Sequence, residues 1–221
     1  MNKWIQSFCA GVGLLAVTVS PAAAQFSANA ALTNNYVWRG VTQSDERFAV
    51  QGGVDYDFGM GAAVGAWAST VDFNDATDFE LDLYGSYSGM ITDMMGFTAG
   101  GIAYLYPNQP GSTDYNFFEI YGGLDFNLDP ATVSGKIYYA PDIYNDSAWY
   151  FTGGVAVPVT DFLEVGANAG YWIWESSSDP WDWNAGATFS WEQFSLFVGY
   201  ADTDLAGFDG QFIATVSVSL P

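Results

Sequence analysis

Short segments of this chain alternate apolar and polar residues with a period of two. The clearest is Phe79-Glu80-Leu81-Asp82-Leu83, and the same rhythm returns in Trp181-Asp182-Trp183-Asn184 and Phe212-Ile213-Ala214-Thr215-Val216-Ser217. Successive side chains of a β-strand point to opposite faces of its sheet. The alternation therefore predicts strands whose apolar face meets an apolar environment and whose polar face meets a polar one.

Twelve such segments follow one another along the chain. We expect them at 26–38, 48–58, 62–73, 79–89, 95–106, 115–126, 131–140, 149–157, 162–174, 181–190, 194–201 and 211–220. Tight turns alternate with longer polar connections at 39–47, 74–78, 107–114, 141–148, 175–180 and 202–210. This pattern predicts an all-β fold, a transmembrane antiparallel β-barrel of about 12 strands with long extracellular loops and short periplasmic turns.

Aromatic residues gather near the ends of these segments, where a membrane barrel carries two girdles. The set expected toward the long loops is Tyr36, Trp38, Phe73, Phe79, Tyr106, Tyr139, Trp149, Trp174 and Trp181; toward the short turns it is Tyr56, Phe58, Tyr87 and Phe126. A soluble β-sandwich would instead concentrate its aromatic residues at strand centres.

The N-terminus has the features of a cleavable signal peptide. Lys3 precedes an apolar stretch at 5–19, and Ala22-Ala23-Ala24 fits the small-residue cleavage pattern. We expect cleavage after Ala24, which divides the chain into a signal peptide, 1–24, and one barrel domain, 25–221. Cys9 is the single cysteine and would leave with the signal, so the exported chain would hold no disulfide.

The charge is strongly negative, with 25 Asp and Glu against 4 Lys and Arg and a net charge of −21. Nucleic acid requires clustered basic residues, so it is excluded as a partner. Attachment to anionic lipid by charge is excluded for the same reason. Disorder is a common property of very acidic chains. It does not fit this chain, because half of its residues are hydrophobic and 18% are aromatic.

The chain contains no histidine. The usual nucleophile–base pairs therefore cannot form, and we expect no enzymatic activity, no catalytic residues and no cofactor. Carboxylates alone are poor ligands for zinc, copper or haem, so we expect no such metal site. The acidic loop 202–210 lacks the ligand spacing of an EF-hand, which favours a solvated turn over a calcium site.

Parity along the segments assigns the residues that face the barrel lumen. If Phe48, Val50, Val54 and Tyr56 face lipid, then Gln51 and Asp55 face inward. The same argument along the chain gives the candidates Arg39, Arg47, Gln51, Asp55, Glu80, Asp82, Glu119, Asp125, Lys136, Glu164, Asn168, Asp182 and Asn184, with the two arginines near the outer rim. These side chains either line an open acidic passage or hydrogen-bond across a closed interior, and the loops 39–47 or 202–210 could fold into it.

The run Asn35-Tyr36-Val37-Trp38-Arg39-Gly40-Val41-Thr42-Gln43-Ser44-Asp45 resembles the opening of the TorF family of proteobacterial porins. Shorter runs at 51–56, 104–107, 119–123 and 200–204 are similar to the same family, in the same order. The resemblance covers nearly the whole exported chain. It implies an outer-membrane barrel that passes small solutes and is inserted by the outer-membrane assembly machinery. Such barrels usually end in an aromatic residue, whereas this chain ends in Ser219-Leu220-Pro221.

These observations predict a porin-like passive channel for small solutes in the outer membrane of a Gram-negative bacterium, with mild cation selectivity. Its partners would be membrane lipid, the assembly machinery and small solutes or cations. Two alternatives remain open at this point. One is a barrel that does not conduct and serves a structural or ligand-binding role, and the other is a soluble periplasmic β-protein. The sequence does not define the oligomeric state.

Overall fold

The computed structural model describes residues 25–111 and 113–221, and the expected signal peptide, 1–24, lies outside the described residues. Within these two stretches, no helix is long and apolar enough to cross a membrane.

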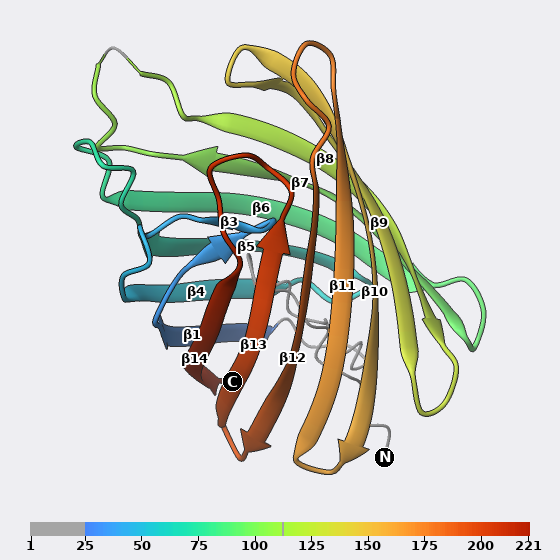
Figure 1. Cartoon of the computed structure of the whole chain (residues 1–221). Helices are drawn as coiled ribbons and strands as arrows, with labels where there is room; N and C mark the ends of the chain where they lie inside the picture. The colour runs from blue at the N-terminus through green and yellow to red at the C-terminus, as the bar shows by residue number, and fades with distance from the viewer. Residues whose placement is uncertain (1–24, 112) are drawn as a thin grey trace.

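Twelve antiparallel strands form a closed barrel (Figure 1). They are β1 Gln25–Thr33, β4 Ala49–Asp57, β5 Ala62–Thr70, β6 Phe79–Met90, β7 Met95–Leu105, β8 Phe117–Asn127, β9 Thr132–Ile143, β10 Asp146–Thr160, β11 Leu163–Trp174, β12 Trp181–Trp191, β13 Phe194–Thr203 and β14 Gln211–Leu220. Each strand pairs with its neighbour in the chain, except that β1 pairs with β4 on one side and with β14 on the other. The pairing of Ala28 with Leu220 and of Thr33 with Thr215 closes the wall. The expected fold class is therefore confirmed.

Long connections lie at one end of the barrel, here called the loop end, and short ones lie at the other, the turn end. The structure does not have the eight-residue loop that the sequence predicts at 141–148. There, β9 continues to Ile143 and β10 begins at Asp146, so that Tyr144 and Asn145 alone form the turn. Both have positive φ, 57° and 65°, which suits a tight hairpin turn whose twist matches that of the strands.

The first expected segment, 26–38, is also corrected by the structure. Strand β1 ends at Thr33, and two further short strands, β2 (Val37–Trp38) and β3 (Val41–Thr42), form a separate two-stranded hairpin. Figure 1 shows this hairpin, drawn in blue, crossing the space that the barrel wall encloses. The wall pairing of β1 ends at Thr33, which pairs with Ala49 at the start of β4. The residues between these two positions leave the wall and include the hairpin.

The two faces of the wall differ as the alternation predicts. On β8, Phe118, Ile120 and Leu124 point outward and are exposed, whereas Glu119 and Tyr121 between them are buried inside. The outer surface therefore carries large apolar side chains on successive strands. Such a surface is unstable in water and stable against lipid acyl chains.

Several aromatic residues expected in the girdle at the loop end lie inside the barrel instead. Tyr36 and Tyr106 are buried, and Trp38 packs against this interior cluster. Trp149 and Trp181 are exposed on the outer surface, as are all four residues expected near the turn end: Tyr56, Phe58, Tyr87 and Phe126. Aromatic residues near strand ends suit both a membrane interface and a filled lumen, so their position along the chain did not separate the two roles.

Candidate functional site

The hairpin β2–β3 is held in the lumen by hydrogen bonds at its base. The side-chain amide of Asn35 donates to the Gln211 side chain at 2.7 Å, and the Thr42 hydroxyl donates to the Asn35 oxygen at 2.6 Å. The backbone N–H of Tyr36 donates to the hydroxyl oxygen of Ser44 at 2.9 Å. This network fixes the entry and the exit of the hairpin against the wall.

The tip of the hairpin is the two-residue turn Arg39-Gly40. Both residues have positive φ, 48° and 81°, as a tight turn of this hand requires. A Cβ on Gly40 would lie 2.7 Å from the Cβ of Thr203 and 2.9 Å from that of Asp182. The backbone of the tip therefore contacts the wall at β12 and β13 so closely that a side chain does not fit there.

Arg39 lies at the centre of the site. Its guanidinium donates to both carboxylate oxygens of Glu119, at 2.8 and 2.7 Å, and the two side chains are only 8% and 0% exposed. Four aromatic rings surround the same group, with the guanidinium carbon 4.0 to 4.8 Å from their centroids: Trp38, Tyr138, Tyr150 and Trp172. We call Glu119 and these four rings the arginine cage.

Further acids are buried around the cage. Tyr104 donates its hydroxyl to Glu119 at 3.0 Å, and Tyr150 donates to Asp182 at 3.1 Å. Glu80 and Asp82, on neighbouring inward positions of β6, are 2% and 0% exposed. In the described part of the chain, neither carboxylate oxygen of Asp82 has a hydrogen-bond partner. The loop-end half of the lumen thus combines aromatic rings with negative charge.

The remaining candidates fall into two groups. Gln51, Asp55, Asp125, Lys136, Glu164, Asn168 and Asn184 occupy inward positions and are half-buried, most of them toward the turn end. Asp55 accepts a hydrogen bond from the Tyr84 hydroxyl at 2.6 Å, and Asn168 accepts one from Thr152 at 2.9 Å. Arg47 lies in the loop before β4, where its side chain is 66% exposed and pairs with Asp45 and Asp72.

Carboxylates also organise the loops at the loop end. Asp75 accepts hydrogen bonds from the backbone N–H of Thr77 at 2.7 Å and from the Tyr115 hydroxyl at 2.9 Å. The first of these is the main reason that the pKa of Asp75 is lowered from its usual value. The Tyr115 bond joins the loop after β5 to the loop after β7.

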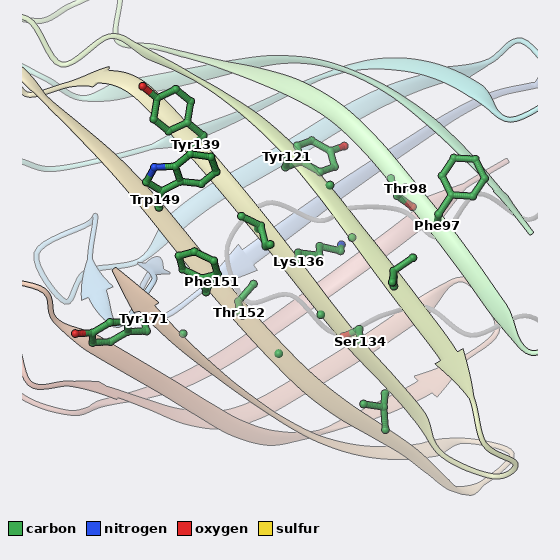
Figure 2. A pocket seen from close by; sticks show the side chains of 18 of the residues that line it. Phe97, Thr98, Tyr121, Ser134, Lys136, Tyr139, Trp149, Phe151, Thr152 and Tyr171 are labelled. Carbon is green, nitrogen blue, oxygen red and sulfur yellow. The ribbon is translucent and has the colours of Figure 1, made fainter. Parts of the chain in front are cut away.

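A depression of about 1080 Å³ lies over strands β7 to β11 (Figure 2). Gly122, Gly135 and Gly153 lie within it, and their missing side chains make the wall thin. Many of its bulky lining residues occupy outward positions and are exposed, among them Ile120, Leu124, Ile137, Trp149, Phe151 and Tyr171. Inward residues line it as well, namely Tyr121, Ser134, Lys136 and Thr152, so the depression lies on the outer face where the wall is thin.

The cage rings are the part of the site that the sequence did not predict. Tyr138 has the inward parity, but Trp38 was placed in the outer girdle, and Tyr150 and Trp172 were not singled out. A signal was present on β10 and β11, where Tyr150 and Trp172 alternate with the outward pair Trp149 and Tyr171.

Small outer-membrane barrels are among the solved structures that resemble this one. The KdgM porin gives a TM-score of 0.63 at 12% identity, over 88% of this chain and 98% of the porin. The NanC porin gives 0.58 at 8% identity, over 88% and 98% of the two chains. LpxR from Salmonella typhimurium gives 0.51 at 9% identity, over 88% and 99%. At these identities the likeness shows the fold alone.

No curated protein sequence matches this chain. A family model described as "Bacterial protein of unknown function (Gcw_chp)" matches residues 17–211, which is most of the sequence. The chain therefore belongs to the Gcw_chp family, and its closed 12-stranded antiparallel barrel resembles the small porins KdgM and NanC.

Proposed function

We propose that this protein is an outer-membrane channel through which small solutes pass by diffusion. One observation carries the proposal: a closed barrel of 12 strands has an apolar outer face and a polar, acidic inner face. A wall of this kind is stable in a bilayer and encloses a lumen wider than that of an eight-stranded barrel. The likeness of the fold to KdgM and NanC supports the same function.

The location rests on the sequence as well as on the wall. The N-terminal residues 1–24 have the pattern of a signal peptide, and the resemblance to the TorF family points to the outer membrane. In this orientation the loop end faces outward and the turn end faces the periplasm. The partners are then membrane lipid, which also fits the exposed apolar residues around the depression on β7 to β11, and the machinery that inserts outer-membrane barrels.

Fractionation tests this location. The protein is expected in detergent extracts of the outer membrane, as a β-rich species that migrates differently in gels before and after heating. Recovery as a soluble periplasmic protein, with no change of migration on heating, would contradict it.

The lumen chemistry favours cations. Arg39 is neutralised by Glu119, and Lys136 is outnumbered by the other inward acids, which include Asp55, Asp125 and Glu164. Fixed negative charge in a confined passage attracts cations and repels anions. One KdgM structure is described as a complex with disordered oligogalacturonate. For the present acidic lumen we propose small cations and neutral solutes.

A second candidate function is favoured by the hairpin β2–β3. It occupies the loop-end half of the lumen, where Tyr36, Tyr104 and Glu119 are fully buried. A hairpin that never leaves this position would make a barrel that does not conduct. We propose the channel in preference because the hairpin is not part of the wall: it pairs with itself, and β1 pairs with β4 without it.

Single-channel recording in planar bilayers decides between the two functions. We expect small, discrete conductance steps from the wild-type protein and larger steps from Arg39→Ala, which removes the ion pair between the hairpin and Glu119 of β8. Steps in the variant alone would show a passage that the hairpin closes. If neither protein conducts, although its gel migration shows that the barrel is folded, the sealed barrel is favoured. We propose no enzymatic activity for the lumen, because it offers neither histidine nor a described cysteine to form a nucleophile–base pair.

A further inference from the structure

The arginine cage has the composition of a receptor for a guanidinium group. The Glu119 carboxylate accepts hydrogen bonds from the two terminal nitrogens of the guanidinium group, at 2.8 and 2.7 Å. Four rings lie within 4.8 Å of the guanidinium carbon. A planar, weakly hydrated cation with fixed donors matches both features, whereas a compact ammonium matches the two carboxylate oxygens less well.

We propose that this cage is a binding site for solutes that carry a guanidinium group, and that Arg39 is a tethered occupant of it. The inference rests on the proposed channel function and names a class of solute for it. When Arg39 leaves the cage, a guanidinium solute can take its place in the lumen. The hairpin and the solute then compete for one site.

The site belongs mostly to the wall. Glu119 comes from β8, Tyr138 from β9, Tyr150 from β10 and Trp172 from β11. Hydrogen bonds of neighbouring strands and the ladder of the barrel hold these residues in place, as the bond from Tyr104 holds Glu119. Among the four rings, Trp38 alone travels with the hairpin. Three rings and the carboxylate therefore remain when the hairpin is absent.

The occupant reaches the cage at a conformational cost. Arg39 has a φ of 48°, in the left-handed region that is unfavourable for a residue with a side chain and that favours Gly or Asn. A turn shaped for stability alone would place one of those residues here. The unfavourable backbone conformation of Arg39 is therefore linked to the position of its guanidinium group beside Glu119.

Removal of the tethered group tests the proposal by chemical rescue. Arg39→Ala leaves Glu119 buried without its cation, which destabilises the barrel. Guanidinium chloride at low-millimolar concentration, far below denaturing levels, should raise the temperature at which the purified variant unfolds in detergent. Sodium chloride and methylammonium chloride at equal ionic strength should do so much less. Heat-induced gel migration and tryptophan fluorescence report the change without any current.

Two matched variants complete the experiment. Arg47→Ala removes the exposed arginine and should show no such response. In the double variant Arg39→Ala/Glu119→Gln, guanidinium should bind at least about tenfold more weakly, because the charged acceptor is lost. If Arg39→Ala does not fold in ordinary buffer, Arg39→Gln and refolding yields with and without guanidinium replace the melting measurement.

The proposal is overturned if guanidinium stabilises Arg39→Ala no more than sodium does. It is also overturned if Arg47→Ala or the double variant responds as strongly. The readout separates this proposal from the channel function. If guanidinium stabilises the variant but the barrel never conducts, the binding site is supported and the channel function is contradicted. If the barrel conducts but guanidinium does not stabilise the variant, the channel function is supported and the binding site is contradicted.

Discussion

At the scale of the residue, the face of the wall decides what a position tolerates. Ile137 is 45% exposed on the outer face near the middle of β9, and Lys136 beside it points inward. A cation at the middle of a bilayer costs about 2–4 kcal/mol. We therefore expect Ile137→Arg to lower the free energy of unfolding by that amount. Lys136→Arg should change it by well under 1 kcal/mol, since that position already holds a cation.

Urea titration of both variants in lipid vesicles measures the difference. If Ile137→Arg were tolerated as well as Lys136→Arg, Ile137 would not face the lipid and the parity of β9 would be wrong. The alternation of residues was sufficient to predict this parity, because a closed wall has one dry face and one wet face. It did not predict the contacts of Arg39, because parity gives the side of a strand and not the depth to which a loop enters the lumen.

At the scale of the element, the hairpin β2–β3 depends on the close approach of Gly40. Gly40→Ala places a methyl group 2.7 Å from the Thr203 Cβ and should displace the tip of the hairpin. We expect a larger single-channel conductance. Gly207→Ala is the matched control, because its φ is also positive, 96°, but nothing lies within 4 Å of the added Cβ. An unchanged conductance in Gly40→Ala, or the same increase in both variants, would argue against the hairpin as the constriction.

The loops at the loop end should loosen in acid. The folded-state pKa of Asp75 is lowered, chiefly by the Thr77 N–H, so its contribution is present above the ordinary carboxylate pKa of about 4 and is lost as the pH falls through the lower folded value. Hydrogen exchange of residues 71–78 should therefore speed up below that range relative to the barrel strands. Asp75→Asn should remove the pH dependence, and its persistence in that variant would assign it to another group.

The hairpin was also the element that sequence patterns concealed. Tyr36 and Trp38 share the even-numbered positions of Phe26, Ala30 and Leu32, so the segment 26–38 had the features of one long strand. A hairpin that packs inside a barrel has one face toward the wall and one toward the lumen, and it obeys the same alternation as the wall itself. The loop 141–148 was misplaced for the converse reason, because polar residues extend β9 and β10 beyond the expected strand ends.

At the scale of the whole molecule, the pattern of loops and strands was sufficient to predict the barrel, its strand number and its two ends. Each strand pairs with its neighbour in the chain, so local patterns determine the topology without long-range information. The filling of the lumen depends on which side chains meet across the barrel. Glu119 and Arg39 are 80 residues apart, and no local pattern relates them.

The central claim is that the lumen is an acidic passage, and the reversal potential in a KCl gradient tests it most directly. The wild-type protein is expected to prefer potassium, and the preference should weaken near 1 M salt, where the Debye length is about 3 Å. Asp125→Asn together with Glu164→Gln should move the reversal potential toward zero, while Arg39→Ala should keep or increase the preference for potassium. A pore that prefers chloride, or one indifferent to the double neutralisation, would contradict the account.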